Sequence, residues 1–235
     1  MIMKLIKKMI YKEKYNSITF IKWMRQKGAS VGERTVIFSP MHTTIDMTRP
    51  WLIDIGNDVQ ITEGVTILTH GYDWSVLKGL YGEVIGSSGR VHIGNNVFIG
   101  MKTTILKGVH IGNNVIIGAN SLVNKNIPDN CVVAGNPAKV IMTIEEYYEK
   151  RKAAQYDEAK ELVIEYKKVY EKDPGNNELS EFFWLFTNQA DDLPYSWDSK
   201  MRLVGNYNES KNKILKNHKM FESLNDFIDK ISESK

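Results

Sequence analysis

Aliphatic residues recur every six positions through the first half of this chain, and small or β-branched residues follow most of them four positions later. An α-helix would place apolar residues about 3.6 positions apart and a half-buried strand 2 apart, so neither accounts for this spacing. A six-residue repeat is typical of a parallel β-helix, in which each hexapeptide forms a short strand and a corner and three of them complete a triangular coil. The inward-facing aliphatic residues expected from this frame are Val31, Ile37, Ile55, Ile61, Ile67, Ile93, Ile99, Ile105, Ile111, Ile117 and Val123.

The six-residue frame is broken at two places. Thr43 and Arg49 occupy positions that would otherwise hold inward aliphatic residues, so the backbone is expected to deviate there. Between Ile67 and Ile93 the frame returns two residues out of phase. We therefore predict a β-helix domain over residues 29–142, with a loop over about 70–89 extruded from one corner. Loops held by a rigid scaffold often carry function.

Residues 1–28 combine apolar side chains with eight Lys or Arg residues and a single acidic residue, Glu13. This composition predicts an amphipathic helical segment that caps the open end of the β-helix, whose first coil would otherwise expose strand edges. Attraction to an anionic membrane surface is the alternative. Capping alone accounts for the apolar residues, so it is the favoured interpretation.

Residues 143–235 have the pattern of an α-helical C-terminal region. Thr143 and Glu146 form a capping box ahead of a helix predicted over about 144–172. A short aromatic helix is expected around 182–186, irregular chain over 187–210, and a last helix over about 211–232. The sequence leaves open whether this region packs on its own prism, on a neighbouring subunit or over a ligand.

Overall composition excludes several classes of protein. The single Cys131 rules out a disulfide framework and suits a reducing compartment, so a cytoplasmic location is expected. No run of 18 apolar residues is present, which argues against a membrane-spanning helix. A net charge of +3 is too small to indicate a nucleic-acid partner.

Three motifs lie on the repeat: the histidine-led loop ILTHGYDWSVL, the run IGANSLVNKNIPDNCVVAGNPAKVI, and the GNPAK at the end of that run. With the hexapeptide frame, they make the stretch from Val31 to Ile141 resemble the left-handed β-helix acyltransferases of the hexapeptide-repeat superfamily. The most similar branches are the maltose, galactoside, xenobiotic and polysaccharide O-acetyltransferases. The resemblance implies a left-handed parallel β-helix, and with the helical segments read from the sequence on either side we expect a mainly β fold with an N-terminal helical cap and a C-terminal α-helical appendage. It also implies a homotrimer with each active site between two prisms.

The same resemblance assigns roles to single residues. His70 matches the catalytic base, and neutral imidazole is suited to accept a proton near pH 7. The backbone amides of Gly100 and Met101 match the position facing the thioester carbonyl, where some relatives carry a serine in place of Met101. Four further residues match contacts to acetyl-CoA, the implied acyl donor: Ala119, Asn124, Lys125 and Lys139.

Acceptor contacts are less sharply indicated. His42 matches a polar residue that holds the acceptor hydroxyl in relatives, and Asp46, Arg49 and Trp51 follow it where the frame is broken. Asp73 and Trp74 in the loop would suit a sugar ring through a hydrogen bond and a stacking face. Structural roles for these six residues remain equally open.

The predicted function is transfer of an acetyl group from acetyl-CoA to a carbohydrate hydroxyl, in surface or capsular polysaccharide synthesis. One alternative keeps the chemistry and changes the acceptor to the amine of a nucleotide-linked amino sugar. Another is a non-catalytic β-helix scaffold whose helical tail recruits a partner.

His92 and His110 lie one coil apart and are expected to stack on the outer face. They could suggest a metal pair, but a ladder of exposed strand residues is the favoured interpretation. The zinc carbonic anhydrases that share this prism need converging histidines, usually with a His-x-x-x-x-His spacing, and the five histidines show no such spacing. No metal is therefore predicted.

Overall fold

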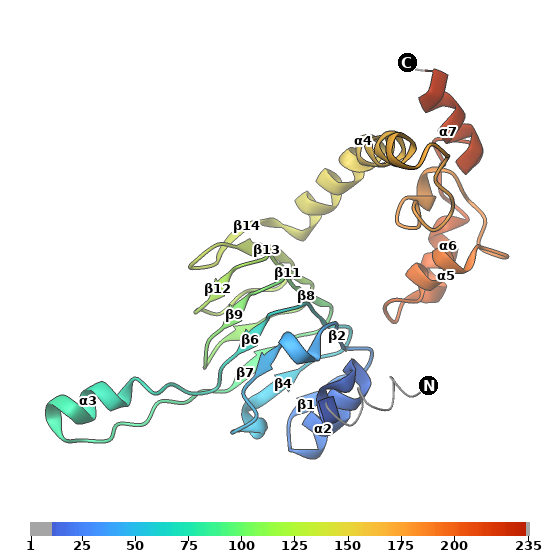
Figure 1. The fold of residues 1–235 in the computed structure, drawn as a ribbon. Coiled ribbons are helices and arrows are strands. Elements are labelled where there is room, and N and C mark those ends of the chain that lie inside the picture. The colour runs from blue at the N-terminus through green and yellow to red at the C-terminus, as the bar shows by residue number, and fades with distance from the viewer. Residues whose placement is uncertain (1–10, 234–235) are drawn as a thin grey trace. The chain divides into compact units, whose positions relative to one another are not determined.

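The computed structural model describes residues 11–233 and divides into two compact units, one up to Tyr147 and one from Tyr148 onward. The first unit is a triangular coil of short strands, followed along the chain by the helices of the second unit (Figure 1).

Three sheets form the faces of the triangular coil, and nearly all of their strands are parallel. Sheet A contains β1 (Ser30–Val31), β4 (Ile53–Ile55), β7 (Val91–Ile93) and β10 (His110–Ile111). Sheet B contains β2 (Val36–Ile37), β5 (Gln60–Ile61), β8 (Val97–Ile99), β11 (Val115–Ile117), β13 (Cys131–Ala134) and β14 (Lys139–Thr143). Sheet C contains β3 (Thr44–Ile45), β6 (Thr66–Ile67), β9 (Thr104–Ile105) and β12 (Leu122–Val123). The antiparallel strand β14 folds back on β13 and closes the coil.

The core of this unit is the stack of aliphatic residues expected from the repeat. All eleven predicted residues are at most 7 % exposed, and strand register places them above one another, as in the pairs Ile93↔Ile111 and Ile99↔Ile117. Parallel pairing satisfies the backbone while each coil buries the apolar face of the next. The predicted left-handed parallel β-helix is confirmed.

The corner between sheets A and B keeps the same length in every coil. The backbone N–H of Asn57 donates to Asn95 Oδ1 at 2.8 Å, and Asn95 N–H donates to Asn113 Oδ1 at 2.9 Å. The glycines beside this ladder are packed against backbone: a Cβ on Gly56 would lie 2.6 Å from the Gly94 carbonyl oxygen. Inward aliphatic residues on either side of this corner are always six positions apart, as in Ile55 and Ile61.

The corners that flank sheet C are irregular, which confirms the predicted deviation of the backbone around Thr43 and Arg49. The 3₁₀ turn η2 (Pro40–His42) adds two residues before β3, so Ile45, not Thr43, is the inward aliphatic residue that pairs with Ile67. Thr43 is one of the small or β-branched residues that are also buried in the coil, and its hydroxyl donates to Ser39 O at 2.8 Å. A second turn, η3 (Pro50–Leu52), lengthens the next corner, and Arg49 lies just before it, outside any strand.

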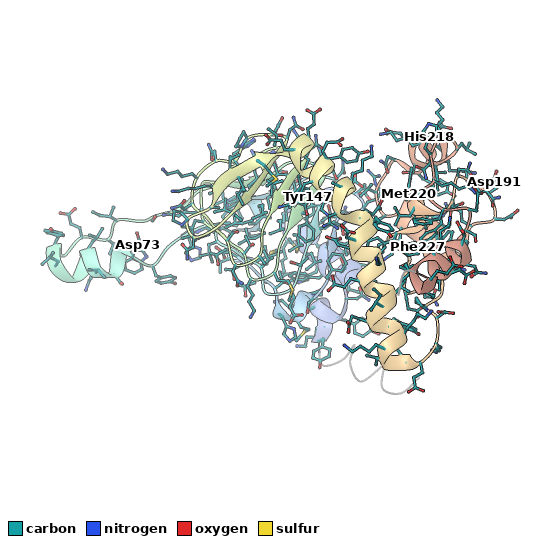
Figure 2. All side chains as sticks on the ribbon, turned by 90° about the horizontal axis from the view of Figure 1, so that it is seen from above. Asp73, Tyr147, Asp191, His218, Met220 and Phe227 are labelled. Atoms are coloured by element: carbon teal, nitrogen blue, oxygen red, sulfur yellow. The ribbon has the colours of Figure 1, made fainter. Side chains whose placement is uncertain are left out.

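Residues 70–89 leave the coil between sheets C and A as a long arm (Figure 1). Its end is the helix α3 (Trp74–Tyr81), which buries none of its side chains, instead of the loop expected from the sequence. Figure 2 shows Asp73 on this arm, away from the body of the coil. The apolar helical sequence WSVLKGLY is therefore left without a partner inside the first unit.

Helix α2 (Ser17–Gln26) follows the 3₁₀ turn η1 (Lys12–Tyr15) and packs on β1 and β2. It starts at a capping box made by Asn16 and Thr19, and it buries Phe20 and Met24 in the core of the coil. Residues 1–10 of the predicted N-terminal cap lie outside the described residues. Within residues 11–233, no helix combines the length and apolar character required to cross a membrane.

The second unit contains most of α4 (Ile144–Tyr170), the turn η4 (Phe183–Leu185), α5 (Tyr195–Met201), α6 (Tyr207–Ile214) and α7 (Leu224–Glu233). The predicted capping box at the start of α4 is confirmed, because Glu146 N–H donates to Thr143 Oγ1 and Thr143 N–H to Glu146 Oε2. The irregular segment predicted over 187–210 is wrong, since it holds α5 and the start of α6. The single last helix is also wrong, because the chain breaks between α6 and α7.

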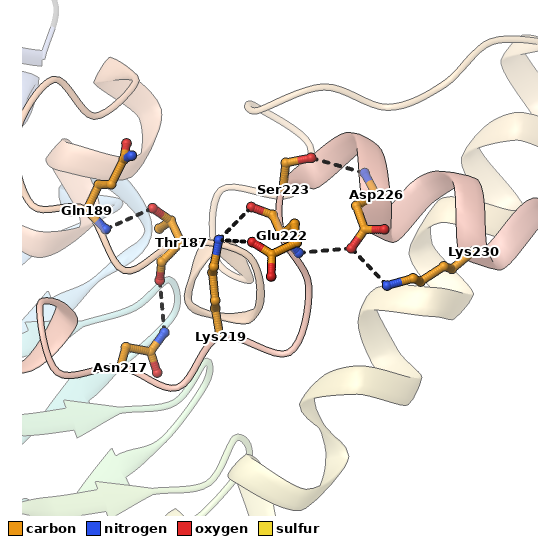
Figure 3. A network of polar contacts seen from close by, with 8 residues as sticks. All are labelled: Thr187, Gln189, Asn217, Lys219, Glu222, Ser223, Asp226 and Lys230. Carbon is orange, nitrogen blue, oxygen red and sulfur yellow. Dashed lines mark hydrogen bonds and ion pairs between the residues drawn. The ribbon is translucent and has the colours of Figure 1, made fainter.

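A polar network fixes the start of α7 (Figure 3). The Asp226 N–H donates to Ser223 Oγ at 3.1 Å, while the Asp226 carboxylate accepts from the Glu222 N–H at 2.9 Å. Lys230 Nζ donates to the same carboxylate at 3.0 Å. The bond from Asp226 N–H satisfies one of the N–H groups that the first turn of a helix leaves free, and the other two tie the Asp226 carboxylate to the chain before α7 and to Lys230 within it.

Candidate active site

His70 and Asp46 meet at the corner between sheets C and A. Asp46 follows β3 and His70 follows β6, and these strands are stacked in register in neighbouring coils. His70 Nδ1 lies 2.6 Å from Asp46 Oδ2, with both side chains largely buried. The structure therefore joins two residues that the sequence assigned to different roles.

The Asp46 carboxylate is held by five hydrogen bonds. Oδ1 accepts from the Thr48 N–H at 3.1 Å and the Thr48 hydroxyl at 2.6 Å. Oδ2 accepts from the Thr69 N–H at 3.2 Å, from the Thr69 hydroxyl and from His70. Burial raises the pKa of Asp46, but the hydrogen bonds from Thr48, Thr69 and His70 outweigh it and hold that pKa far below its ordinary value.

An ionised carboxylate can only accept a hydrogen bond, so Nδ1 of His70 carries the proton in this pair. The Nε2 atom of the neutral ring is then free to take a proton from another group. This is the chemistry of a general base whose ring is oriented by a buried acid.

The base of the arm anchors His70. Ser88 pairs with His70 as an isolated antiparallel bridge, and the Gly89 N–H donates to Thr69 O at 2.9 Å. Tyr72 packs edge-on against the His70 ring with centroids 5.7 Å apart, and Trp74 lies 5.7 Å beyond Tyr72. Aromatic side chains therefore continue from the imidazole into the arm.

Gly100 and Met101 lie at a different corner, between sheets B and C. The Gly100 N–H already donates to Ile117 O at 2.8 Å, so in this structure the amide is engaged with the backbone of the next coil. No hydrogen bond within the described residues uses the Met101 N–H, and the Met101 side chain is exposed. Only Met101 therefore retains a free amide for this role.

The residues predicted to contact the coenzyme flank sheet C on both sides. Ala119 lies one coil of 18 residues beyond Met101, and a Cβ added to Gly100 would come within 2.5 Å of the Ala119 nitrogen. Asn124 and Lys125 follow β12 at the corner between sheets C and A, and both are exposed. Lys139 opens β14 and is exposed as well.

Of the six predicted acceptor residues, Asp46 contacts His70 directly, and the other five are spread over two corners and the arm. His42 lies in η2, at the corner between sheets B and C, and its Nδ1 is 2.9 Å from Glu63 Oε1. Arg49 precedes η3 and the exposed Trp51 lies within it, and both are at the same corner as His70 but one coil earlier. Asp73 and Trp74 start α3 on the arm. Asp46 is occupied by Thr48, Thr69 and His70, so we assign it a positioning role in place of an acceptor contact.

The predicted ladder of His92 and His110 is confirmed on the outer face of sheet A. The two rings are stacked 4.5 Å apart at 11°. The sequence analysis missed that Asp54 joins this ladder, with His92 Nδ1 2.7 Å from Asp54 Oδ2. Asp54 and His92 are 38 residues apart, which is one coil of 18 plus the 20 residues of the arm, so removing the arm from the count would have revealed the pair.

Comparisons with known proteins point to one family. The model for "Bacterial transferase hexapeptide (six repeats)" matches residues 90–125. "Protein CapG" of Staphylococcus aureus is 45% identical over 147 residues, which cover 63% of this chain and 84% of that protein. The galactoside O-acetyltransferase of Escherichia coli is 40% identical over 94 residues, 40% of this chain and 45% of that enzyme.

Among solved structures, a galactoside acetyltransferase in complex with coenzyme A shares 26% sequence identity with this chain. The alignment covers 62% of this chain and 82% of that one, with a TM-score of 0.43.

Proposed function

This chain belongs to the bacterial hexapeptide-repeat acetyltransferases, and we propose that it transfers an acetyl group from acetyl-CoA to a carbohydrate hydroxyl used in surface or capsular polysaccharide. The observation that carries the proposal is the 2.6 Å contact between His70 and the buried carboxylate of Asp46. An oriented imidazole of this kind is what direct transfer between two bound substrates requires.

In the first step, His70 Nε2 takes the proton of the acceptor hydroxyl while its oxygen attacks the thioester carbonyl carbon. A C–O bond forms, and the carbonyl oxygen gains the negative charge. The free N–H of Met101 donates a hydrogen bond to that oxygen. Asp46 accepts from Nδ1 throughout and stabilises the imidazolium that forms.

In the second step, the C–S bond breaks and the sulfur leaves with the electron pair. The imidazolium of His70 returns its proton to the thiolate, which leaves the ring neutral for the next cycle. No side chain forms a covalent intermediate, so one histidine serves as both base and acid.

The two halves of this site lie on different corners of one prism, and this supports a homotrimer. His70 is at the corner between sheets C and A, while Met101 and Ala119 are at the corner between sheets B and C. A second copy that places its B–C corner against the C–A corner of the first completes the site. The exposed apolar residues of α3 supply further surface for such an assembly.

The remaining contacts follow from exposure and charge. Lys125 and Lys139 have no ion-pair partner within residues 11–233, and they would bind the phosphates of the coenzyme, next to Asn124. Trp51, Asp73 and Trp74 offer stacking faces and a carboxylate to a sugar, with Arg49 and His42 as further polar contacts. The unpaired, buried Cys131 suits an enzyme working in the reducing cytoplasm.

Release of the coenzyme thiol, measured with a panel of sugar acceptors, tests this function. Replacing His70 by alanine should lower turnover by about 10²- to 10⁴-fold, while acetyl-CoA binding measured by calorimetry stays unchanged. Turnover within a few-fold of the wild type would remove His70 from the mechanism. The same panel should include nucleotide-linked amino sugars, because stimulation by an amine alone would replace the hydroxyl acceptor. A chain that neither binds acetyl-CoA nor releases thiol would be a scaffold.

A further inference from the structure

A cavity of about 410 Å³ opens on the outer face of sheet A, and none of the steps above uses it. It is lined by Asp54, Arg90, His92, Gly108, Val109 and His110. Its volume falls within the range of roughly 300–1,000 Å³ found for small-ligand sites. The lining combines a carboxylate, a guanidinium and two imidazoles with exposed backbone.

Asp54 organises the polar groups of this cavity. Its Oδ2 accepts from Arg90 Nη2 at 2.6 Å and from His92 Nδ1 at 2.7 Å. Burial raises the pKa of Asp54, but hydrogen bonds from His92 and Ser30 lower it by more, so the group is ionised. The His92 proton therefore lies on Nδ1, and Nε2 is left to accept from a ligand hydroxyl.

The other two side chains keep unused hydrogen-bonding groups. Arg90 is 64% exposed and spends one of its five N–H groups on Asp54 within the described residues. The His110 ring stacks flat on His92 and has no hydrogen-bond partner in the part of the chain that the structure describes. A forked guanidinium beside the unpaired His110 ring matches the two oxygens of a carboxylate or phosphate.

The cavity begins beside the base of the arm. Ser88 pairs with His70, Gly89 donates to Thr69, and Arg90 is the next residue along the chain. A long acceptor bound with one hydroxyl at His70 can thus continue onto sheet A. The stacked rings offer it a flat face, and Asp54 and His92 offer groups for sugar hydroxyls.

We infer that this cavity is an acceptor subsite for an anionic sugar unit, whose carboxylate or phosphate is held by Arg90 and His110. The inference rests on the proposed function, and it narrows the acceptor to an acidic carbohydrate. Arg90 selects the charged group. His92, which Asp54 orients, accepts a hydrogen bond from a hydroxyl of the same sugar.

Calorimetric titration of the full-length protein tests the inference with three probes: glucuronate, glucose 1-phosphate and neutral glucose. At least one acidic probe should bind about tenfold or more tightly than glucose, as expected for a hydrogen bond to a charged group. Arg90→Gln should reduce that affinity by about tenfold. Arg34→Gln is the matched control, because Arg34 pairs with Asp58 at the same 2.6 Å on another corner of the prism.

A second measurement reports on the site itself. Histidine ring resonances in NMR spectra should shift for His92 and His110 on addition of the acidic probe, while His218 in the second unit stays fixed. Binding of glucuronate would identify the charged group of the acceptor as the carboxylate of a uronic acid, and binding of glucose 1-phosphate would identify it as a sugar phosphate. Equal affinity for glucose, equal losses in Arg34→Gln and Arg90→Gln, or unmoved His92 and His110 resonances would each overturn the subsite.

Thiol release separates this inference from the proposed function. If acetyl transfer proceeds equally well to neutral sugars and the Arg90→Gln variant keeps the wild-type KM for acidic acceptors, the subsite is wrong and the transferase stands. If no acceptor releases thiol but acidic sugars still bind through Arg90, the proposed function is wrong and the binding site stands.

Discussion

Replacing Asp46 by asparagine isolates the contribution of one negative charge to the proposed base. The asparagine amide can be placed in two ways. With its NH₂ group at the Oδ2 position it would face the fixed donors Thr69 N–H and His70 Nδ1, but at the Oδ1 position the only fixed donor it meets is the Thr48 N–H. The second placement leaves fewer unpaired donors, so His70 keeps its orientation and its tautomer.

What the variant loses is then the charge that faces the imidazolium formed during the reaction. A charge-assisted hydrogen bond exceeds a neutral one by about 1–2 kcal/mol, which corresponds to about a 5- to 30-fold fall in kcat. His70→Ala removes the base altogether and should cost about 10²- to 10⁴-fold. The two variants are therefore expected to differ clearly.

The assay is thiol release by the two single variants and by the double variant, each checked for folding by circular dichroism. Because Asp46 acts only through His70, the double variant should be no slower than His70→Ala. Asp58→Asn is the matched control, since it weakens another carboxylate pair of the prism, with Arg34, and should leave kcat unchanged. A further loss in the double variant, or a fall in Asp46→Asn as large as that in His70→Ala, would refute this account.

Three further outcomes are expected. The folded-state pKa of Asp46 lies below its unfolded value of about 3.9, so the unfolded chain binds the proton first as pH falls. Between about pH 5 and the folded pKa of Asp46, the free energy of unfolding should therefore fall more in the wild type than in Asp46→Asn. The same fall with pH in both proteins, measured by chemical denaturation, would contradict this. Gly100→Ala places a Cβ 2.5 Å from the Ala119 nitrogen and should cost about 1–3 kcal/mol in chemical denaturation, whereas Gly79→Ala, with nothing within 4 Å, should cost none. Leu80→Asp on the arm should shift the assembly toward monomers in light scattering, while Ile18→Asp on the exposed side of α2 should not; an unchanged mass for both would remove the arm from the interface.

The repeat predicts the prism because each hexapeptide meets an identical neighbour, so local pattern and tertiary packing coincide. The contact between Asp46 and His70 could not be predicted in this way, because it lies where the chain departs from the repeat. Asp46 and His70 are separated by 24 residues, and the turn η3 lengthens that coil, so the spacing does not match the regular coil of 18 residues that would place two residues above one another. Recognising Ile45 as the inward residue would have placed Asp46 next to β6.

The second unit has no repeat to guide prediction. Trp197 and Phe227 are buried by contacts with residues far along the chain, and α5 and α7 are too short to be stable without that packing. The break between α6 and α7 has the same origin, because Asn217 Nδ2 donates to the carbonyl groups of Trp184 and Thr187 and turns the chain there.

The asparagine ladder between sheets A and B has a consequence for how such a protein can diversify. Every coil crosses that edge in six residues, with side-chain amides spanning the rungs and glycines in backbone contact, so an inserted residue would break two coils at once. All length variation, in η2, η3 and the arm, has accumulated at the other two edges. New recognition elements can therefore be inserted at the two edges of sheet C without disturbing the corner between sheets A and B, which holds the coils in register.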